Sequence, residues 1–168
     1  IEDFVVVIDT SMSCSGDLVR CFLEETYDVL CQSDSYFKKT NIHIIQCDEQ
    51  VQQDRLITNQ EEMEAYMRDF TIIGQGGTDF RPAFEYVNGL IRQGAFRRLK
   101  GLLYFTDGEG IYPVKRPVYD TAFVFLKDQY TDISVPAWAM KLILEPEQLL
   151  ENSGGQSSGS KVAKDSPL

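Results

Sequence analysis

Short apolar runs separated by polar loops recur along the chain. Residues 4–8 form a continuous run of β-branched and aromatic side chains, which is typical of a strand buried on both faces of a sheet. Residues 102–106 form a second run of this kind. Further strands are predicted over residues 122–126 and 135–144, and residues 42–45 and 51–57 predict a hairpin around a short polar turn.

Other segments have the periodicity of amphipathic helices, over residues 16–30, 58–70 and 82–93. Thr58 and Glu61 have the spacing of a capping box, and Pro82 suits the first turn of the third helix. Strands that alternate with helices predict an α/β domain. We expect a Rossmann-like three-layer α/β/α sandwich, with a mostly parallel central sheet and an antiparallel hairpin at one edge.

The composition is that of one globular domain. The chain has 168 residues, of which 43% are hydrophobic and 25% are charged, so it can bury a core of its own. We expect the domain to occupy residues 1–151, and the Ser- and Gly-rich residues 152–168 to form a flexible tail. The chain starts with Ile1 rather than Met, which indicates a fragment of a longer protein.

The charge and the cysteines exclude several classes of function. The 16 Lys and Arg against 26 Asp and Glu leave a net charge of −10, which argues against nucleic acid as a partner. No apolar run approaches the roughly 20 residues that span a bilayer, so we expect no membrane segment. Four cysteines without a CxxC pair, beside a single histidine, argue against a Cys/His zinc site and a disulfide framework. We therefore expect reduced thiols and a cytoplasmic location.

Three polar loops carry the candidate chemistry. Asp9, Ser11 and Ser13 directly follow the first predicted buried strand, and Asp107 follows the strand over residues 102–106. In open parallel sheets, ligands bind at the carboxyl ends of strands where the strand order reverses. If the two strands are neighbours, Asp9 and Asp107 converge, and Thr78 could reach the same point from the loop before the third helix.

These five residues would form a site made only of oxygen atoms. Two carboxylates and three hydroxyls, with no thiolate or imidazole, suit a hard divalent cation such as Mg²⁺ (or Mn²⁺). Without a cation the two carboxylates would repel each other in the cleft. Asp79 and Glu109 lie next to the site in sequence. We expect them to stand behind the ligands or to face a partner, although Asp79 could also be an N-terminal helix charge and Glu109 a solvated loop residue.

The three loops resemble the metal-ion-dependent adhesion site (MIDAS) of von Willebrand factor A (VWA)-type domains. That pattern is Asp-x-Ser-x-Ser, a distant Thr and a distant Asp, and the chain has them in this order as Asp9-Thr-Ser-Met-Ser13, Thr78 and Asp107. The sequences Gly76-Gly-Thr-Asp-Phe-Arg-Pro82 and Thr106-Asp-Gly-Glu-Gly110 look like a narrower bacterial group. In that group a VWA-like domain forms the C-terminal half of metallopeptidase-type proteins. The resemblance covers nearly all of the chain before the predicted tail.

The resemblance implies a fold, a ligand set and a function. It implies that Asp9, Ser11, Ser13, Thr78 and Asp107 hold the metal, and that the ion keeps one position open for a Glu or Asp of a partner protein. It implies a binding module rather than an enzyme, since the peptidase-like half lies outside this chain and no HExxH occurs in it. It also implies a MoxR-type AAA+ ATPase as a partner in assembling or activating other proteins.

Other interpretations compete with the metal site. Cys14 and Arg20 have the C-x5-R spacing of cysteine-dependent phosphatases, but Asp17 inside that loop opposes both a thiolate and a phosphate. A phosphatase of the haloacid dehalogenase type needs an Asp where this chain has Ser11. Asp and Ser also commonly act as caps and turns, so the chain could be a degenerate structural domain that binds no metal.

Overall fold

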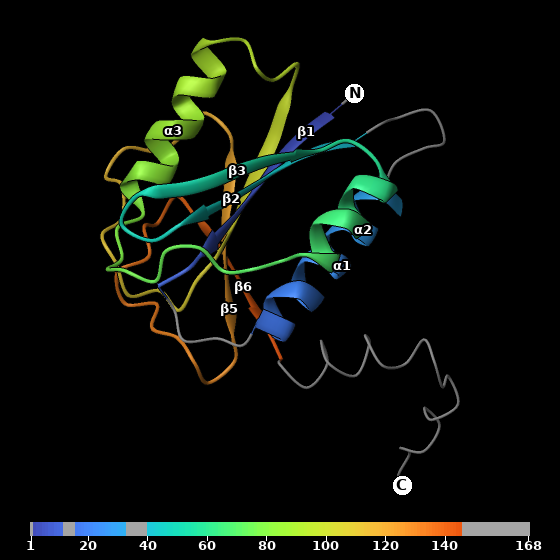
Figure 1. Cartoon of the computed structure of the whole chain (residues 1–168). Coiled ribbons are helices and arrows are strands. Elements are labelled where there is room, and N and C mark those ends of the chain that lie inside the picture. Colours follow the sequence, from blue (N-terminus) through green and yellow to red (C-terminus); the bar gives the residue numbers. More distant parts are fainter. Residues whose placement is uncertain (1, 12–15, 33–39, 146–168) are drawn as a thin grey trace, which may run out of the picture.

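The computed structural model describes residues 2–11, 16–32 and 40–145, which form a sheet covered by helices (Figure 1). The prediction of a tail over residues 152–168 falls outside the described residues. The strands are β1 (Glu2–Asp9), β2 (Thr40–Cys47), β3 (Val51–Ile57), β4 (Leu99–Phe105), β5 (Asp120–Leu126) and β6 (Met140–Leu144), and the helices are α1 (Gly16–Gln32), α2 (Gln60–Arg68) and α3 (Arg81–Arg92).

The sheet confirms the predicted fold class. Its six strands lie in the order β3-β2-β1-β4-β5-β6, and every neighbouring pair is parallel except the β2–β3 hairpin at one edge. The chain builds outward from β1 to β2 and β3, then returns to the other side of β1 with β4. The strand order therefore reverses between β1 and β4, which is the place where such sheets bind ligands.

The helices cover both faces of the sheet (Figure 1). Helices α1 and α2 pack on one face, where Phe22 of α1 stacks on Phe105 at 4.3 Å between ring centroids. Helix α3 packs on the other face, where Phe84 stacks on Tyr104 at 5.8 Å. Because β1 has apolar side chains on both faces, it is buried along almost its whole length. The buried centre of the sheet thus holds the carboxyl ends of β1 and β4 in fixed positions.

Two local predictions from the sequence are wrong. The N-cap of α2 is Asn59, whose side chain accepts the Glu62 amide at 2.8 Å. Glu62, not Glu61, accepts from the amide of Thr58 at 2.7 Å. The capping arrangement is thus shifted by one residue. The last strand was predicted from residue 135, whereas β6 begins only at Met140. Pro136 has no amide to donate to a strand, and its carbonyl accepts the amide of Ala139 at 3.1 Å in a turn before β6.

None of the described helices is both long and apolar enough to cross a membrane. Cys21 and Cys47 are buried free thiols.

Candidate metal centre

The carboxyl ends of β1 and β4 are joined through side chains. Asp9, the last residue of β1, is 1% exposed. Thr106 directly follows β4, and its hydroxyl donates to Asp9 Oδ2 at 2.5 Å. The same hydroxyl oxygen accepts the amide of Gly108 at 3.1 Å. One carboxylate oxygen of Asp9 is therefore committed to the neighbouring strand, while the other points to the loop that follows β1.

Ser11 links the second oxygen of Asp9 to Thr78. The Ser11 amide donates to Asp9 Oδ1 at 2.9 Å, and the Ser11 hydroxyl donates to the same oxygen. The Ser11 hydroxyl also forms a hydrogen bond with the Thr78 hydroxyl. Three oxygens from two loops that lie 67 residues apart in sequence thus form one cluster above the end of β1.

The other predicted site residues have different surroundings. Asp107 is half-buried, its Oδ1 accepts the amide of Glu109 at 3.0 Å, and Glu109 itself is exposed. Asp79 is engaged by Arg81, whose Nη2 donates to Oδ2 at 2.8 Å and whose Nε donates to Oδ1 at 3.0 Å. These bonds hold the pKa of Asp79 below its usual range. Ser13 lies outside the described residues.

The carboxylates of Asp9 and Asp107 have no cationic side chain beside them in the described part of the chain. Burial raises the pKa of Asp9, although hydrogen bonds from Ser11 and Thr106 offset part of the rise, and the charge of Asp107 adds to it. Neither Asp9 nor Asp107 forms an ion pair with a Lys or Arg within the described part of the chain. A bound divalent cation would supply the missing positive charge.

The donor set fits such an ion. No group of three or more His, Cys, Asp and Glu side chains that could hold a metal ion occurs among the described residues. The predicted set contains only two carboxylates, and its remaining donors are hydroxyl oxygens. In proteins, Mg²⁺ is usually bound by one or two carboxylates, and neutral oxygens and water complete its coordination.

Asp48 positions the loop that carries Thr78, and sequence reasoning missed it. Its Oδ1 accepts from the amide of Gln50 and from the side chain of Gln52, both at 3.0 Å. Its Oδ2 accepts the amide of Gly76 at 3.0 Å. Asp48 directly follows β2, just as Asp9 ends β1 and Asp107 comes two residues after β4, so the same signal in the sequence could have drawn attention to it.

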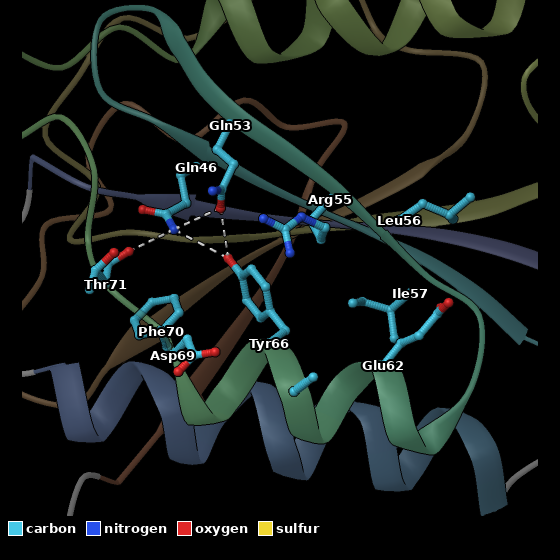
Figure 2. Close-up of a pocket in the computed structure, with 11 residues that line it drawn as sticks. Gln46, Gln53, Arg55, Leu56, Ile57, Glu62, Tyr66, Asp69, Phe70 and Thr71 are labelled. Atoms are coloured by element: carbon cyan, nitrogen blue, oxygen red, sulfur yellow. Dashed lines mark hydrogen bonds between the residues drawn. The ribbon is translucent and has the colours of Figure 1, made fainter.

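Gln46 anchors the same loop further upstream. Figure 2 shows its side chain reaching from β2 toward Tyr66 of α2 and toward Thr71, inside a pocket of about 430 Å³. Its amide donates to Tyr66 Oη at 3.2 Å and to the carbonyl of Thr71 at 3.0 Å, and its Oε1 accepts the amide of Ile73 at 2.8 Å. Because both ends of this carboxamide are hydrogen-bonded within the fold, we assign Gln46 a structural role in holding residues 71–73. No motif in the neighbouring sequence predicts this role for Gln46.

Replacing Asp48 by alanine should weaken metal binding without touching a predicted ligand. Three donors would lose their acceptor, so we expect the free energy of unfolding to fall by about 2 kcal/mol. We also expect Mg²⁺ affinity to fall about tenfold, since the loop that carries Thr78 loses its bond from Gly76 to the Asp48 carboxylate. Urea denaturation in EDTA and calorimetric titration would measure the two effects. Glu49→Ala removes the same charge from the adjacent exposed residue and is the control; equal effects of both variants would contradict the positioning role of Asp48.

The comparisons with known proteins agree with the observed fold. A model of the family described as VWA-like domain (DUF2201) matches residues 4–145. The chain belongs to this family. The match runs from β1 to the end of β6 and so includes the whole sheet. A comparison of this VWA-like sequence with curated proteins finds no match.

Solved VWA structures share the fold of this VWA-like domain. Proximal thread matrix protein 1 from the mussel byssus, in a structure with a zinc-occupied MIDAS motif, is 12% identical with a TM-score of 0.64 over 88% of this chain and 45% of that chain. The ArnB paralog VWA2 from Sulfolobus acidocaldarius is 14% identical, with a TM-score of 0.59 over 88% and 42%. The SpRpn10 VWA domain is 13% identical, with a TM-score of 0.54 over all of both chains. The chain thus spans less than half of the mussel protein. At identities of 12–14%, these similarities show a shared fold and not a shared function.

Proposed function

We propose that this VWA-like domain is a cation-dependent protein-binding module. Asp9, Ser11, Ser13, Thr78 and Asp107 would hold a Mg²⁺ (or Mn²⁺) ion at the carboxyl ends of β1 and β4, as in a MIDAS. The ion would keep one position free for an Asp or Glu side chain of a partner protein. The observation that carries the proposal is the cluster of hydroxyl and carboxylate oxygens that Ser11 forms with Asp9 and Thr78.

Charge supports both parts of the proposal. The buried carboxylate of Asp9 has Asp107 as an electrostatic neighbour and no cationic partner among the described residues, so a divalent ion is the group that this end of the sheet lacks. The chain carries a net charge of −10, which by itself would repel an acidic partner. A cation shared between the two proteins would remove that repulsion where they meet. The structure of the mussel protein with a zinc-occupied MIDAS motif supports a divalent metal at this place in the fold.

The finer parts of the proposal follow from the resemblance described above. We propose that the domain acts as a binding module rather than an enzyme, and that it works in the cytoplasm of bacteria, with no nucleic acid or membrane as its partner. Its longer protein would be of the metallopeptidase type, with a MoxR-type AAA+ ATPase as one partner. Asp79 and Glu109 would lie beside the ion, with Asp79 held by Arg81 and Glu109 exposed toward the partner.

Metal binding to the wild-type domain tests the proposal. We expect Mg²⁺ and Mn²⁺ to bind in a calorimetric titration and to stabilise the domain by about 2.7 kcal/mol at a metal concentration one hundred times the Kd. Thr78→Ala should weaken binding at least about tenfold, because it removes one oxygen donor. Thr71→Ala is the matched control, since only the backbone carbonyl of that exposed residue is used. If neither ion binds the wild type, the domain is structural and the proposal is wrong.

The phosphatase alternative has less support. Cys14 lies outside the described residues, and Arg20 donates from Nη1 to Asp17 Oδ1 at 3.1 Å. An arginine that binds phosphate needs its guanidinium free for the anion, whereas this one pairs with an acidic residue in the first turn of the same helix, α1. Turnover of a phosphate ester by the wild type that is lost in Cys14→Ser would favour a phosphatase over the binding module.

A further inference from the structure

A second hollow lies on the α3 side of the molecule, away from the pocket of Figure 2. It is a cleft of about 470 Å³ between α3 and residues 113–118. Phe84 and Ile91 of α3 form part of one wall, and Pro113 and Pro117 form part of the other. We call it the α3 cleft.

The loop wall of the α3 cleft exposes apolar side chains that the core does not use. Val114 is 96% exposed and Val118 is 89% exposed. The loop is nevertheless held at both ends. The carbonyl of Ile111 accepts the amide of Phe80 at 3.0 Å, and Tyr119, which follows the loop, is 6% exposed. Two prolines further restrict the backbone between these anchors. An apolar surface that is already ordered loses little entropy when a partner binds it.

The cleft is also positively charged, in contrast to the rest of the chain. Arg92, Lys115 and Arg116 line it, are exposed, and form no ion pair with any acidic side chain that the structure describes. A fourth cation, Arg81, is paired with Asp79, and Glu85 is the one carboxylate among the lining residues. In a chain with a net charge of −10, three such cations around an apolar cleft mark a local reversal of sign.

We propose that the α3 cleft docks an acidic peptide segment of a partner protein, one in which apolar side chains alternate with Asp or Glu. The carboxylates would pair with Arg92, Lys115 and Arg116, and the apolar side chains would cover Val114 and Val118. The exposed valines favour a peptide over a nucleic acid, whose phosphates would use the cations and leave the apolar wall bare.

The position of the cleft relates it to the candidate metal centre, but binding there does not need the metal. Helix α3 begins at Arg81, three residues after Thr78. The loop wall is tied to the same place through the bond between Phe80 and Ile111. A partner that reaches the metal with one acidic side chain would therefore find the Arg81 end of the cleft close by. The cleft would add contacts that remain when the ion is removed.

Peptide selection in EDTA tests this proposal apart from the metal site. A displayed library of random 12-residue peptides would be selected on the wild-type domain in EDTA, with counter-selection on a Lys115→Glu/Arg116→Glu variant. We expect enrichment of peptides that combine Asp or Glu with Leu, Ile, Val or Phe. Fluorescence anisotropy of a selected peptide should show affinity at least about tenfold weaker for the double variant, and weaker in high salt for the wild type.

Matched variants separate the cleft from general electrostatics. Arg97→Glu/Arg98→Glu changes the net charge by the same amount at two exposed residues outside the cleft, and should change the Kd less than about twofold. Val114→Ser should weaken the binding of the selected peptide. It should leave the thermal unfolding temperature of the domain unchanged, because the side chain of Val114 is 96% exposed.

The outcomes distinguish this proposal from the metal proposal. Asp9→Asn should bind the selected peptide as the wild type does, even if it no longer binds Mg²⁺. No enrichment, enrichment of basic or uncharged peptides, or equal loss in both double variants would overturn the docking site. Selective binding of DNA or RNA to the cleft would also overturn the proposal. So would a dimer of the wild type, seen in sedimentation, that dissociates in the Lys115→Glu/Arg116→Glu variant. Either result would mean that a different molecule occupies the cleft.

Discussion

Gly108→Ala is expected to lower the free energy of unfolding by about 3 kcal/mol or more. Gly108 has a φ of +88°, which L-residues rarely adopt. A Cβ atom there would overlap the carbonyl oxygen of Thr131 and lie 3.2 Å from Phe125 Cε1. Thr131 cannot easily move away, because its amide donates to the carbonyl of Asp107 at 2.9 Å. Urea denaturation in EDTA would measure the loss.

Gly94→Ala is the matched control for the backbone strain alone. Gly94 has a φ of +75°, but nothing lies within 4 Å of a Cβ atom built on it. We therefore expect its alanine variant to lose only about 1 kcal/mol. A loss at Gly108 no larger than the loss at Gly94 would mean that the loop relaxes around the new methyl group. Because Gly108 directly follows Asp107, we also expect any folded Gly108→Ala protein to bind Mg²⁺ more weakly.

Asp9→Asn should abolish the response to Mg²⁺ without destabilising the metal-free domain. Altering a residue that merely supports a ligand costs up to about a hundredfold in metal affinity, so loss of a charged ligand should cost at least that much. In EDTA the variant should be as stable as the wild type or more stable, because burial penalises the charge of Asp9. The raised pKa means that ionisation of Asp9 takes stability away as the pH rises, and asparagine removes this cost. Thermal unfolding with Mg²⁺ and with EDTA would measure both effects.

Asp3→Asn is the matched control at the other end of β1. Asp3 is 3% exposed and accepts the amides of Arg97 and Arg98 at 2.9 and 3.1 Å. The variant should lose stability in EDTA, since a charged acceptor of two amides becomes a neutral one. It should keep the full response to Mg²⁺. If Asp9→Asn behaved like Asp3→Asn in both measurements, Asp9 would be a structural carboxylate and not a metal ligand.

Most of the fold could be predicted because its signals are local. The run over residues 4–8 is apolar on both faces, so only the middle of a covered sheet suits it, and β1 lies there. The hairpin follows from the short turn between two strand patterns. The N-cap of α2 was misplaced because Asn59 and Thr58 are adjacent and both can cap. Geometry alone chooses between such neighbours.

The candidate site could be predicted only in part, for a related reason. A strand followed by Asp is a visible pattern, and it selected Asp9 and Asp107. The residues that position the loop of Thr78 are not visible in this way. Gln46 acts through a side chain that spans from β2 to residues 71–73, and its own neighbours in sequence are strand residues like any others.

The sequence by itself determined the alternation of strands and helices, the order of the polar loops and the acidity of the chain, because each depends on residue type and spacing along the chain. Only the tertiary structure decided that β1 and β4 are neighbours and that the Ser11 hydroxyl links Asp9 to Thr78. It also brought the cations of α3 and of residues 113–118 together around one cleft. Contacts between residues far apart in sequence depend on how whole elements pack, and that packing is a property of the complete sheet rather than of any one segment.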